Sequence, residues 1–355
     1  PFFVQKARQQ KAPEINTCIA CNQACLDHIF ERKQASCLVN PRAGYETSLQ
    51  IKPASDLKKV AVVGAGPAGL AAATTAASRG HQVPLFEAAG EIGGQFNMAK
   101  QIPGKEEFHE TIRYFRVMLE KHGVEVKLNH RVTSKELIEG AFDHVVLATG
   151  VTPRNITLEG IDHPSVLGYI DVLRHRKKVG DRVAIIGAGG IGFDVAEFLT
   201  HVEEPADEQI AGFAREWGID QKYKNRGGLM DATVTKPRRT VYLCQRSTHK
   251  PGANLGKTTG WIHRSSLRKK EVQFLSGVQY QRVDDQGLHL TQEGMPRVLE
   301  VDHVIVCAGQ ESLRDLQAPL LEAGCTVHLA GGSDEARELD AKRAIDQATR
   351  LAAIL

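Results

Sequence analysis

The sequence lacks the long apolar runs that would place it in a membrane. Hydrophobic residues make up 42% of its 355 residues and charged residues 25%, which are ordinary values for a globular chain with a packed core. No apolar run reaches the roughly 18–20 residues that cross a bilayer, and the N-terminal stretch turns polar within a few residues, unlike a signal peptide. We therefore expect no membrane association, and the length predicts about two domains.

The chain also has little net charge and no disulfide framework. The net charge is +3, and no basic patch is interleaved with aromatic residues, so nucleic acid is not an expected partner. Seven cysteines, an odd number, favour a reducing compartment over paired disulfides, and we expect a cytoplasmic protein. The first residue is Pro1 rather than Met, and we expect the chain to be a piece of a longer protein.

The strongest pattern is a glycine turn between an apolar strand and a helix. In KKVAVVGAGPAGLAAATTAASRG, the residues Gly64, Gly66 and Gly69 follow the strand 60–63 in G-x-G-x-x-G spacing. Such a turn lets the backbone approach a pyrophosphate, and free N–H groups at the start of the helix bind the anion. Glu87 closes the next strand, where a carboxylate can accept hydrogen bonds from ribose hydroxyls. This unit predicts a dinucleotide site.

A second copy of the turn occurs in DRVAIIGAGGIGFDVAEFL, where Gly187, Gly189 and Gly192 follow the strand 183–186. The next strand comes late, because residues 201–238 form an insertion that we expect to be polar.

The strand after the insertion, TVYLCQRSTHK, ends in Arg246, with Lys250 close behind. A guanidinium binds a 2′-phosphate that a carboxylate would repel. One charge-assisted hydrogen bond contributes roughly 1.5–3 kcal/mol, or about ten- to a hundredfold in affinity. We therefore predict that the second turn binds NADPH rather than NADH. The alternative is that Arg246 only solvates the end of a strand.

Three further segments set the order of the domains. One apolar strand ends in Ala148-Thr149-Gly150, and the segment 303–310 repeats this pattern at the end of the second unit. The C-terminal stretch combines a strand, Gly331-Gly332, Asp334 and a long helix. We expect this helix to return to the first domain, with its start near Asp340–Ala344 aimed at a flavin. The second nucleotide domain is then inserted into the first. This layout resembles that of the two-dinucleotide flavoprotein reductases, in which the first site holds FAD and the second NAD(P)H.

The predicted fold is an α/β chain of two Rossmann-like dinucleotide-binding domains, one inserted in the other, preceded by a small cysteine-rich segment. The predicted boundaries are 1–56 for the linker and cysteine segment, 57–155 plus 308–355 for the FAD-binding domain, and 156–307 for the NADP(H)-binding domain. Disulfide reductases of this class carry a redox-active cysteine pair, which we do not find. Cys244 and Cys307 fall in apolar strands, as expected of inert core residues.

Four cysteines gather in one short segment with C-x2-C-x3-C-x11-C spacing: Cys18, Cys21, Cys25 and Cys37. Structural zinc usually takes two separate C-x2-C pairs, whereas three close ligands and one remote ligand are nearer to a [4Fe–4S] pattern. The match is imperfect, because ferredoxin-type runs place Pro directly after the last Cys. We favour the cluster, because it would give electrons an exit from the flavin, and zinc is the alternative.

Four segments carry a resemblance to a known family: the cysteine motif and the stretches EIGGQFNMAKQIPGKEEF, IIGAGGIGFDVA and LGKTTGWIHR. Together they make the chain resemble the C-terminal half of the bacterial NADPH-dependent 2,4-dienoyl-CoA reductases, which are iron–sulfur flavoproteins related to trimethylamine dehydrogenase. The resemblance covers essentially the whole chain. It implies hydride transfer from NADPH to FAD and then single electrons through the cluster to FMN, in the β-oxidation of unsaturated fatty acyl-CoA. Family members hold FMN, the acid–base residues and the dienoyl-CoA substrate in an N-terminal barrel. This sequence does not include the barrel, so no catalytic residue is named, and the barrel, covalent or separate, is the implied partner.

Together with the two glycine turns, the resemblance implies the residues of each site, and it implies that the four cysteines ligate the cluster. The candidate FAD residues are Gly64, Gly66, Pro67, Ala68, Gly69, Glu87, Gly94, Gln95, Lys105, Val132, Ala148, Thr149, Gly150, Gly332 and Asp334. The candidate NADPH residues are Gly187, Gly189, Gly190, Gly192, Arg246 and Lys250. Two other functions stay open. One is a stand-alone NADPH:acceptor reductase subunit like the small subunit of glutamate synthase, and the other is a non-catalytic zinc or redox-sensor module.

Overall fold

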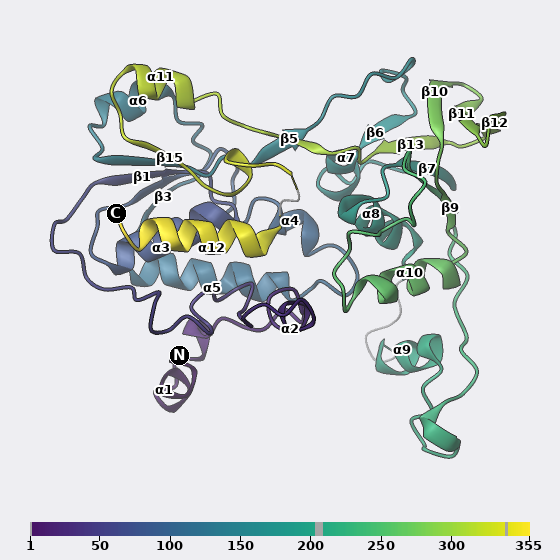
Figure 1. Cartoon of the computed structure of the whole chain (residues 1–355), viewed down its shortest axis with the longest axis horizontal. Coiled ribbons are helices and arrows are strands. Elements are labelled where there is room, and N and C mark those ends of the chain that lie inside the picture. Colours follow the sequence, from purple (N-terminus) through teal and green to yellow (C-terminus); the bar gives the residue numbers. More distant parts are fainter. Residues whose placement is uncertain (1, 203–208, 338–339) are drawn as a thin grey trace. The chain divides into compact units, whose positions relative to one another are not determined.

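The computed structural model describes residues 2–202, 209–337 and 340–355, and the chain forms two compact units (Figure 1). The first unit contains Pro1–Arg154, Gly256–Thr258 and Gly309–Leu355, and the second contains Asn155–Leu255 and Thr259–Ala308. Within the described ranges, no helix is both long and apolar enough to span a membrane.

A parallel five-stranded sheet forms the centre of the first unit, in the strand order β15-β4-β1-β2-β3. Its strands are β1 (Val60–Val63), β2 (Pro84–Phe86), β3 (Glu125–Lys127), β4 (His144–Leu147) and β15 (Val327–Leu329). The central strand β1 is buried on both faces: Val60 and Val62 pack into one hydrophobic core and Ala61 and Val63 into another. Burial on both faces explains why the run VAVV contains no polar residue.

Helices cover both faces of this sheet (Figure 1). The cores place α3, α5 and α12 on one face and α6 and α11 on the other. The helices of the unit are α1 (Phe3–Arg8), α2 (Leu26–Phe30), α3 (Pro67–Ser78), α4 (Phe96–Ala99), α5 (Phe108–Lys121), α6 (Ser134–Glu139), α11 (Gln317–Glu322) and α12 (Ala341–Ala352), with 3-10 turns η1 (Ala12–Glu14) and η3 (Gly331–Ser333). The alanine-rich helix α3 packs against α12, because its small side chains allow a close approach.

An antiparallel ribbon of β5 (Val151–Pro153) and β14 (Gln310–Ser312) lies where the chain leaves the first unit and returns to it. Beside the ribbon, the hydroxyl of Thr149 donates to the carbonyl oxygen of Leu313 at 2.6 Å, and the amide of Leu313 donates to the carbonyl oxygen of Gly150 at 3.1 Å. The end of β4 is therefore tied to the returning chain.

The second unit is built on a parallel five-stranded sheet in the order β6-β13-β7-β8-β9. Its strands are β6 (Val166–Gly168), β7 (Arg182–Ile186), β8 (Thr240–Cys244), β9 (Gln273–Leu275) and β13 (His303–Val306). Like β1 in the first unit, the strand before the glycine turn lies inside the sheet, between β13 and β8. The predicted α/β fold with two parallel, Rossmann-like sheets is therefore confirmed.

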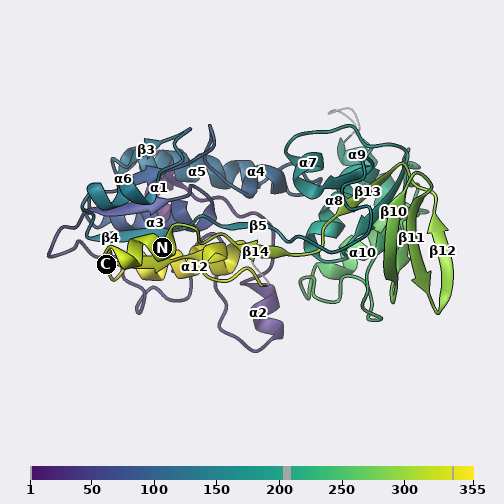
Figure 2. The same ribbon diagram turned by 90° about the horizontal axis from the view of Figure 1, so that it is seen from above.

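An antiparallel sheet of β10 (Gln279–Asp284), β11 (Gly287–Gln292) and β12 (Met295–Leu299) adds a second layer to this unit (Figure 2). Leu288 and Leu290 from β11 share a hydrophobic core with Ala184 and Ile186 from β7. The helices of the unit are α7 (Tyr169–Leu173), α8 (Gly190–Thr200), α9 (Gln209–Trp217) and α10 (Gly260–Lys269), with the 3-10 turn η2 (Arg226–Gly228).

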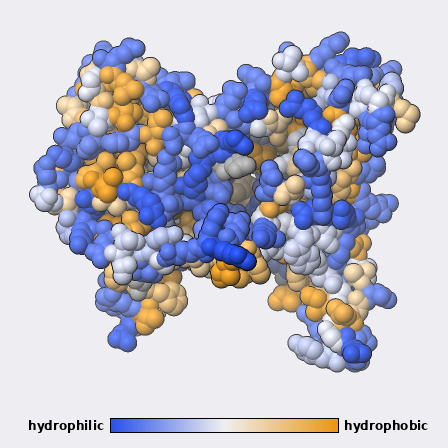
Figure 3. Space-filling view, in the orientation of Figure 1, coloured by the Kyte–Doolittle hydropathy of each residue, from blue (hydrophilic) through white to orange (hydrophobic). Residues whose placement is uncertain are grey.

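We expected the insertion 201–238 to be polar, but its described part is not uniformly so. Residues 203–208 lie outside the described residues, but the segment after them forms α9, with Gly212 and Ala214 buried and Ile210 and Phe213 exposed. Apolar side chains gather on the surface around α9, and also over α1 in the first unit (Figure 3). The polar expectation rested on the overall composition of the segment and overlooked the helical period of its apolar residues.

Candidate dinucleotide sites and cysteine segment

The first glycine turn joins β1 to α3 and needs glycine for two different reasons. Gly64 has φ of +100°, and a Cβ on Gly69 would overlap the carbonyl oxygen of Gly64. Pro67 lies in the first turn of α3, where its missing N–H leaves no hydrogen bond unmade. By contrast, a Cβ on Gly66 would come no closer than 4.0 Å to its nearest neighbour, the Cα of Gly94. A side chain at Gly66 would therefore overlap no other part of the protein, although Gly94 lies beside it.

Glu87 follows β2 and is held against this turn by two backbone amides. Its Oε2 accepts a hydrogen bond from the amide of Ala65 at 2.7 Å, and its Oε1 accepts one from the amide of Ala89 at 2.8 Å. The carboxylate therefore has a fixed orientation beside the glycine turn. Its remaining lone pairs can accept from the hydroxyls of a ribose.

The returning chain lies beside the same turn. Gly331 has φ of +68°, and a Cβ there would lie 2.9 Å from the Cβ of Ala68 in the first turn of α3. The helix α12 begins after Asp340, whose carboxylate accepts from the amide of Arg343 at 2.7 Å. The predicted start of this helix near Asp340–Ala344 is confirmed, and the η3 turn that carries Gly332 lies directly against α3.

The other candidate FAD residues come from four separate segments of the first unit. Ala148 contacts the turn directly, because a Cβ on Gly64 would overlap its carbonyl oxygen. Gln95 is the N-cap of α4 and is half-buried, as is Lys105 in the loop before α5. Val132 is buried in a core cluster with Phe86 and Leu147.

Gln347 was missed by sequence reasoning. Its side-chain oxygen accepts from the amide of Gly331 at 2.8 Å, and its side-chain nitrogen donates to Oδ2 of Asp334 at 2.7 Å. In the sequence it is one polar residue within an amphipathic helix, which carries no signal of a binding role.

The second glycine turn joins β7 to α8 and repeats the geometry of the first. Gly187 has φ of +110°, and a Cβ on Gly192 would overlap the carbonyl oxygen of Gly187. A Cβ on Gly189 or on Gly190 would meet no atom within 4 Å. The start of α8 is therefore open, and its unpaired backbone N–H groups favour an anion there.

The loop after β8 displays Arg246. The side-chain amide of Gln245 donates to the carbonyl oxygens of Ser247 and His249, which closes the loop on itself. Arg246 and Lys250 are both exposed. Burial raises the pKa of Tyr280, and the Arg246 guanidinium opposes this shift. The Tyr280 hydroxyl has no hydrogen-bond partner among the described residues.

The cysteine segment has a strained backbone around its second cysteine. Ala20 (φ +53°) and Asn22 (φ +59°) flank Cys21 in the left-handed region, which residues other than glycine rarely adopt. Such strain concentrates at functional sites, where the surrounding structure holds it in place. Cys25 follows as the N-cap residue of α2.

The four cysteines of this segment differ in their exposure. Burial raises the pKa of Cys21, and the thiols of Cys37, Cys25 and Cys18 raise it further. Cys21 and Cys37 pack against the core under α3, whereas Cys18 and Cys25 are exposed. The amide of Ala20 donates to the sulfur of Cys18 at 3.4 Å. In the described part of the chain, no group of three or more His, Cys, Asp or Glu side chains is placed to hold a single metal ion.

Asp27 is a second residue that sequence reasoning missed. This buried carboxylate accepts from the amide of Lys257 at 3.2 Å and from the amide and hydroxyl of Thr258 at 2.8 and 2.6 Å. It ties α2 to the segment Gly256–Thr258 of the same unit. The partners are about 230 residues apart in sequence, so no local pattern indicates the contact.

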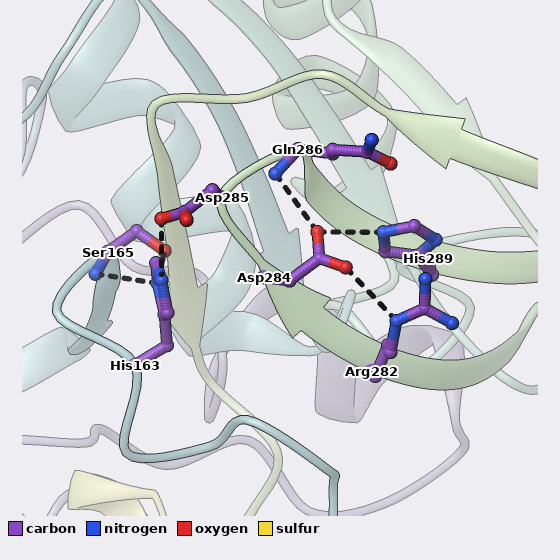
Figure 4. Close-up of polar contacts among 7 residues, drawn as sticks. All are labelled: His163, Ser165, Arg282, Asp284, Asp285, Gln286 and His289. Atoms are coloured by element: carbon purple, nitrogen blue, oxygen red, sulfur yellow. Dashed lines mark hydrogen bonds and ion pairs between the residues drawn. The ribbon is translucent and has the colours of Figure 1, made fainter.

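Two polar clusters in the second unit are not a catalytic site (Figure 4). Ser165 Oγ lies 2.7 Å from His163 Nδ1, and His163 Nε2 lies 3.2 Å from Asp285. The order resembles a Ser-His-Asp triad, but the Ser165 amide also donates to His163 Nδ1 and Asp285 is fully exposed. The group closes the turn before β6, and the neighbouring Asp284–His289 contact closes the β10–β11 hairpin.

The remaining cysteines behave as core residues. All seven cysteines are free, and Cys244 and Cys307 are buried. Burial raises the pKa of Cys244 to about 12 and also raises that of Cys307. A thiol that stays protonated is a poor nucleophile, so the prediction that both are inert is supported.

Comparisons with known proteins agree with this geometry. Residues 58–335 match the family described as pyridine nucleotide-disulphide oxidoreductase. The chain is 30% identical over 90% of its length to a metal reductase from Desulforamulus reducens, and 28% identical over 100% of its length to a bilirubin reductase from Mediterraneibacter gnavus. These matches cover 48% and 50% of the two relatives. The chain thus spans about half the length of the curated relatives it matches.

Solved structures share the fold of this chain. A 2-naphthoyl-CoA reductase in complex with 2-naphthoyl-CoA is similar with a TM-score of 0.84 and 27% identity, over 100% of this chain and 49% of that one. The thioredoxin reductase of T. acidophilum, at 16% identity, shares the fold with a TM-score of 0.58, over 84% of this chain and 96% of that one. The chain therefore belongs to the pyridine nucleotide-disulphide oxidoreductase family, whose FAD- and NAD(P)H-binding domain it contains.

Proposed function

We propose that this chain is the electron-entry part of an NADPH-dependent flavoprotein reductase. FAD binds at the first glycine turn, NADPH binds at the second, and the four cysteines hold a [4Fe–4S] cluster. The observation that carries the proposal is the presence, in one chain, of two glycine turns with equivalent geometry and a segment with four cysteines in C-x2-C-x3-C-x11-C spacing.

The first turn suits FAD on the grounds of space and charge. Gly66 leaves the backbone accessible, and the start of α3 offers N–H groups to a pyrophosphate. Two backbone amides hold the carboxylate of Glu87, whose remaining lone pairs can accept from hydroxyls and which would repel a phosphate. A dinucleotide without a 2′-phosphate on its ribose, such as FAD, fits this combination.

The second turn suits NADPH for the opposite reason. No carboxylate follows β8, and the exposed Arg246 lies two residues beyond the end of that strand, with Lys250 close by. A guanidinium can form a charge-assisted, bidentate contact with a phosphate. The buried hydroxyl of Tyr280, which lacks a partner in the described structure, is a further group that such a ligand could satisfy.

The cysteine segment suits a cluster better than a single ion. Zinc draws four sulfurs to within about 2.3 Å of one point, whereas each cysteine of a [4Fe–4S] site binds a different iron, so the ligands lie farther apart. The C-x2-C-x3-C-x11-C spacing, with three close cysteines and one remote cysteine, is nearer to the cluster pattern than to two separate C-x2-C pairs. Backbone donation to Cys18 is of the kind that tunes cluster potentials.

The residues of this chain bind and orient, and the bound groups supply the redox chemistry. Bound at these residues, FAD would supply a hydride acceptor for NADPH, and a [4Fe–4S] cluster would supply one-electron transfer. The glycine turns fix the two dinucleotides by their phosphates. Buried Cys244 and Cys307 take no part, because their thiols stay protonated.

We propose that substrate choice lies with a domain other than the two units described here. The names of the relatives specify a metal, bilirubin and 2-naphthoyl-CoA, which are not of one substrate class. Each match nevertheless spans most or all of this chain and about half of the relative. This half therefore supplies a function that all of them need, the delivery of electrons. We propose a 2,4-dienoyl-CoA as the substrate of the whole protein, reduced at FMN in a preceding barrel.

Anaerobic mixing with NADPH tests the proposal. The purified chain, once its flavin and cluster contents are established, is expected to bleach its flavin absorbance and to reduce ferricyanide, but not a dienoyl-CoA. Arg246→Ala should weaken NADPH relative to NADH by about ten- to a hundredfold. Arg297→Ala, which removes another exposed arginine of the same unit, is the matched control. A loaded chain that NADPH does not reduce would refute the proposal.

A further inference from the structure

The geometry points to a positioning role for Gln347: we infer that it fixes the carboxylate of Asp334 so that this group accepts a hydrogen bond from a hydroxyl of FAD. The inference deepens the proposed FAD site and rests on it. Gln347 lies on α12 and touches two residues of the returning chain, Gly331 and Asp334.

The two contacts of Gln347 determine which way its amide points. The backbone N–H of Gly331 can only donate, so the side-chain oxygen of Gln347 must face it, at 2.8 Å. The NH2 group then faces Oδ2 of Asp334, at 2.7 Å. This arrangement requires Asp334 to act as an acceptor, and it holds one carboxylate oxygen while the other stays available.

The contacts around Gly331 place Asp334 at the edge of the first glycine turn. A Cβ on Gly331 would lie 2.9 Å from that of Ala68 and 3.3 Å from that of Ala344. The hydroxyl of Ser333 donates to the carbonyl oxygen of Leu147, at the end of β4, at 2.6 Å. The turn is therefore fixed on three sides, by α3, α12 and the central sheet, and Asp334 follows it directly.

The charge of Asp334 decides what part of FAD it can meet. A carboxylate repels the two phosphates, which the start of α3 binds, but it accepts strongly from a hydroxyl group. FAD offers such hydroxyls on its sugar and sugar-alcohol parts. A carboxylate held by one oxygen through Gln347 presents the other in a fixed direction, so less freedom is lost when FAD binds.

A charge substitution at Gln347 separates this role from simple packing. In Gln347→Glu the carboxylate still accepts from Gly331 but faces Asp334 with a second negative charge. Two carboxylates at this distance share a proton, so the affinity of the variant for FAD should fall as the pH rises from 6 to 9. Gln347→Ala should weaken FAD binding by about tenfold at every pH, and the wild type should show a flat profile. FAD dissociation constants are measured by fluorescence titration of the flavin-free chain.

Gln50→Glu is the matched control, because Gln50 is exposed in the same unit and the change adds the same charge. Should Gln347→Glu not fold, Gln347→Met, which keeps the volume but neither hydrogen-bonding group, carries the test, with the same loss expected as for alanine. Variants at Gln347 that bind FAD like the wild type, with a flat pH profile, would overturn this inference alone. A wild-type chain and a Gln50→Glu control that both reject FAD would overturn the proposed FAD site as well.

Discussion

Gly66 and Gly189 hold the same place in the two glycine turns, and each can be changed without disturbing the fold. Gly66 has φ of −78° and Gly189 has φ of −86°, which alanine also adopts, and no protein atom lies closer than 4.0 Å to a Cβ at either position. Gly189→Ala should therefore keep the wild-type Tm and raise the Kd for NADPH about tenfold or more, because the added methyl group occupies the path of the ligand.

Gly192→Ala is the contrasting variant of that turn. A Cβ there would overlap the carbonyl oxygen of Gly187, so the loss should appear in the Tm itself. Paired thermal melts and NADPH titrations distinguish the two. Equal loss of Tm in both variants would contradict the view that Gly189 serves the ligand.

Asp284 should make the stability of the second unit depend on pH. Its carboxylate accepts from His289 at 2.8 Å, from the Gln286 amide at 2.9 Å and from Arg282 at 3.0 Å (Figure 4), and these bonds lower its pKa to about 2. Because the folded pKa lies below the unfolded value of about 3.9, the stabilisation is present above about pH 4 and is lost as the pH falls toward 2. The Tm difference between the wild type and Asp284→Asn should shrink below about pH 4.

The neighbouring carboxylate provides the control for this pH series. Asp285 is fully exposed and contacts His163, so Asp285→Asn should change the Tm little at any pH. A Tm offset for Asp284→Asn that stays constant from pH 7 to pH 3 would mean that the carboxylate charge is not what stabilises the hairpin.

At the scale of elements, a buried ion pair joins α8 to α10. Lys270 donates to Oε2 of Glu197 at 2.9 Å, and the two side chains are only 11% and 8% exposed. Lys270→Met leaves the buried Glu197 carboxylate without a cation, with only the Ser266 hydroxyl donating to it, so it should lower the free energy of unfolding by about 3–5 kcal/mol. The double variant with Glu197→Gln should recover much of that loss, as measured by urea unfolding.

The exposed pair of Lys236 and Glu271 is the control for the buried one. Its side chains are 81% and 71% exposed, so removing it should cost less than about 1 kcal/mol. If Lys270→Met is no more destabilising than Lys236→Met, the contact between α8 and α10 does not depend on the ion pair.

Elements with local signatures were predictable from the sequence, and those that depend on distant partners were not. The strand 60–63, the glycine turn and the return of the last helix follow from patterns that extend over about 20 residues. The antiparallel sheet β10–β12 was not anticipated, although Gly287 and Gly294 mark its two tight turns and Leu288 and Leu290 alternate along β11. The apolar period of α9 lay within a segment whose average composition is polar.

The same distinction holds for the candidate sites of the whole molecule. Gly64, Gly69 and their counterparts in the second turn are required by backbone geometry, so a motif identifies them. Asp27 and Gln347 contact residues that are brought to them by the fold, and the partners of Asp27 lie about 230 residues away in the sequence. Only a three-dimensional structure shows such contacts, because each of these residues is an ordinary polar side chain in its local sequence.

At the scale of the whole molecule, we propose that one chain binds FAD and a [4Fe–4S] cluster and takes its electrons from NADPH. The most direct test is a count of iron, acid-labile sulfide, zinc and flavin in the chain purified without oxygen. The account predicts about four irons, about four sulfides and about one FAD per chain, with no stoichiometric zinc. About one zinc per chain in place of iron and sulfide, or a chain that takes up no FAD on reconstitution, would contradict it.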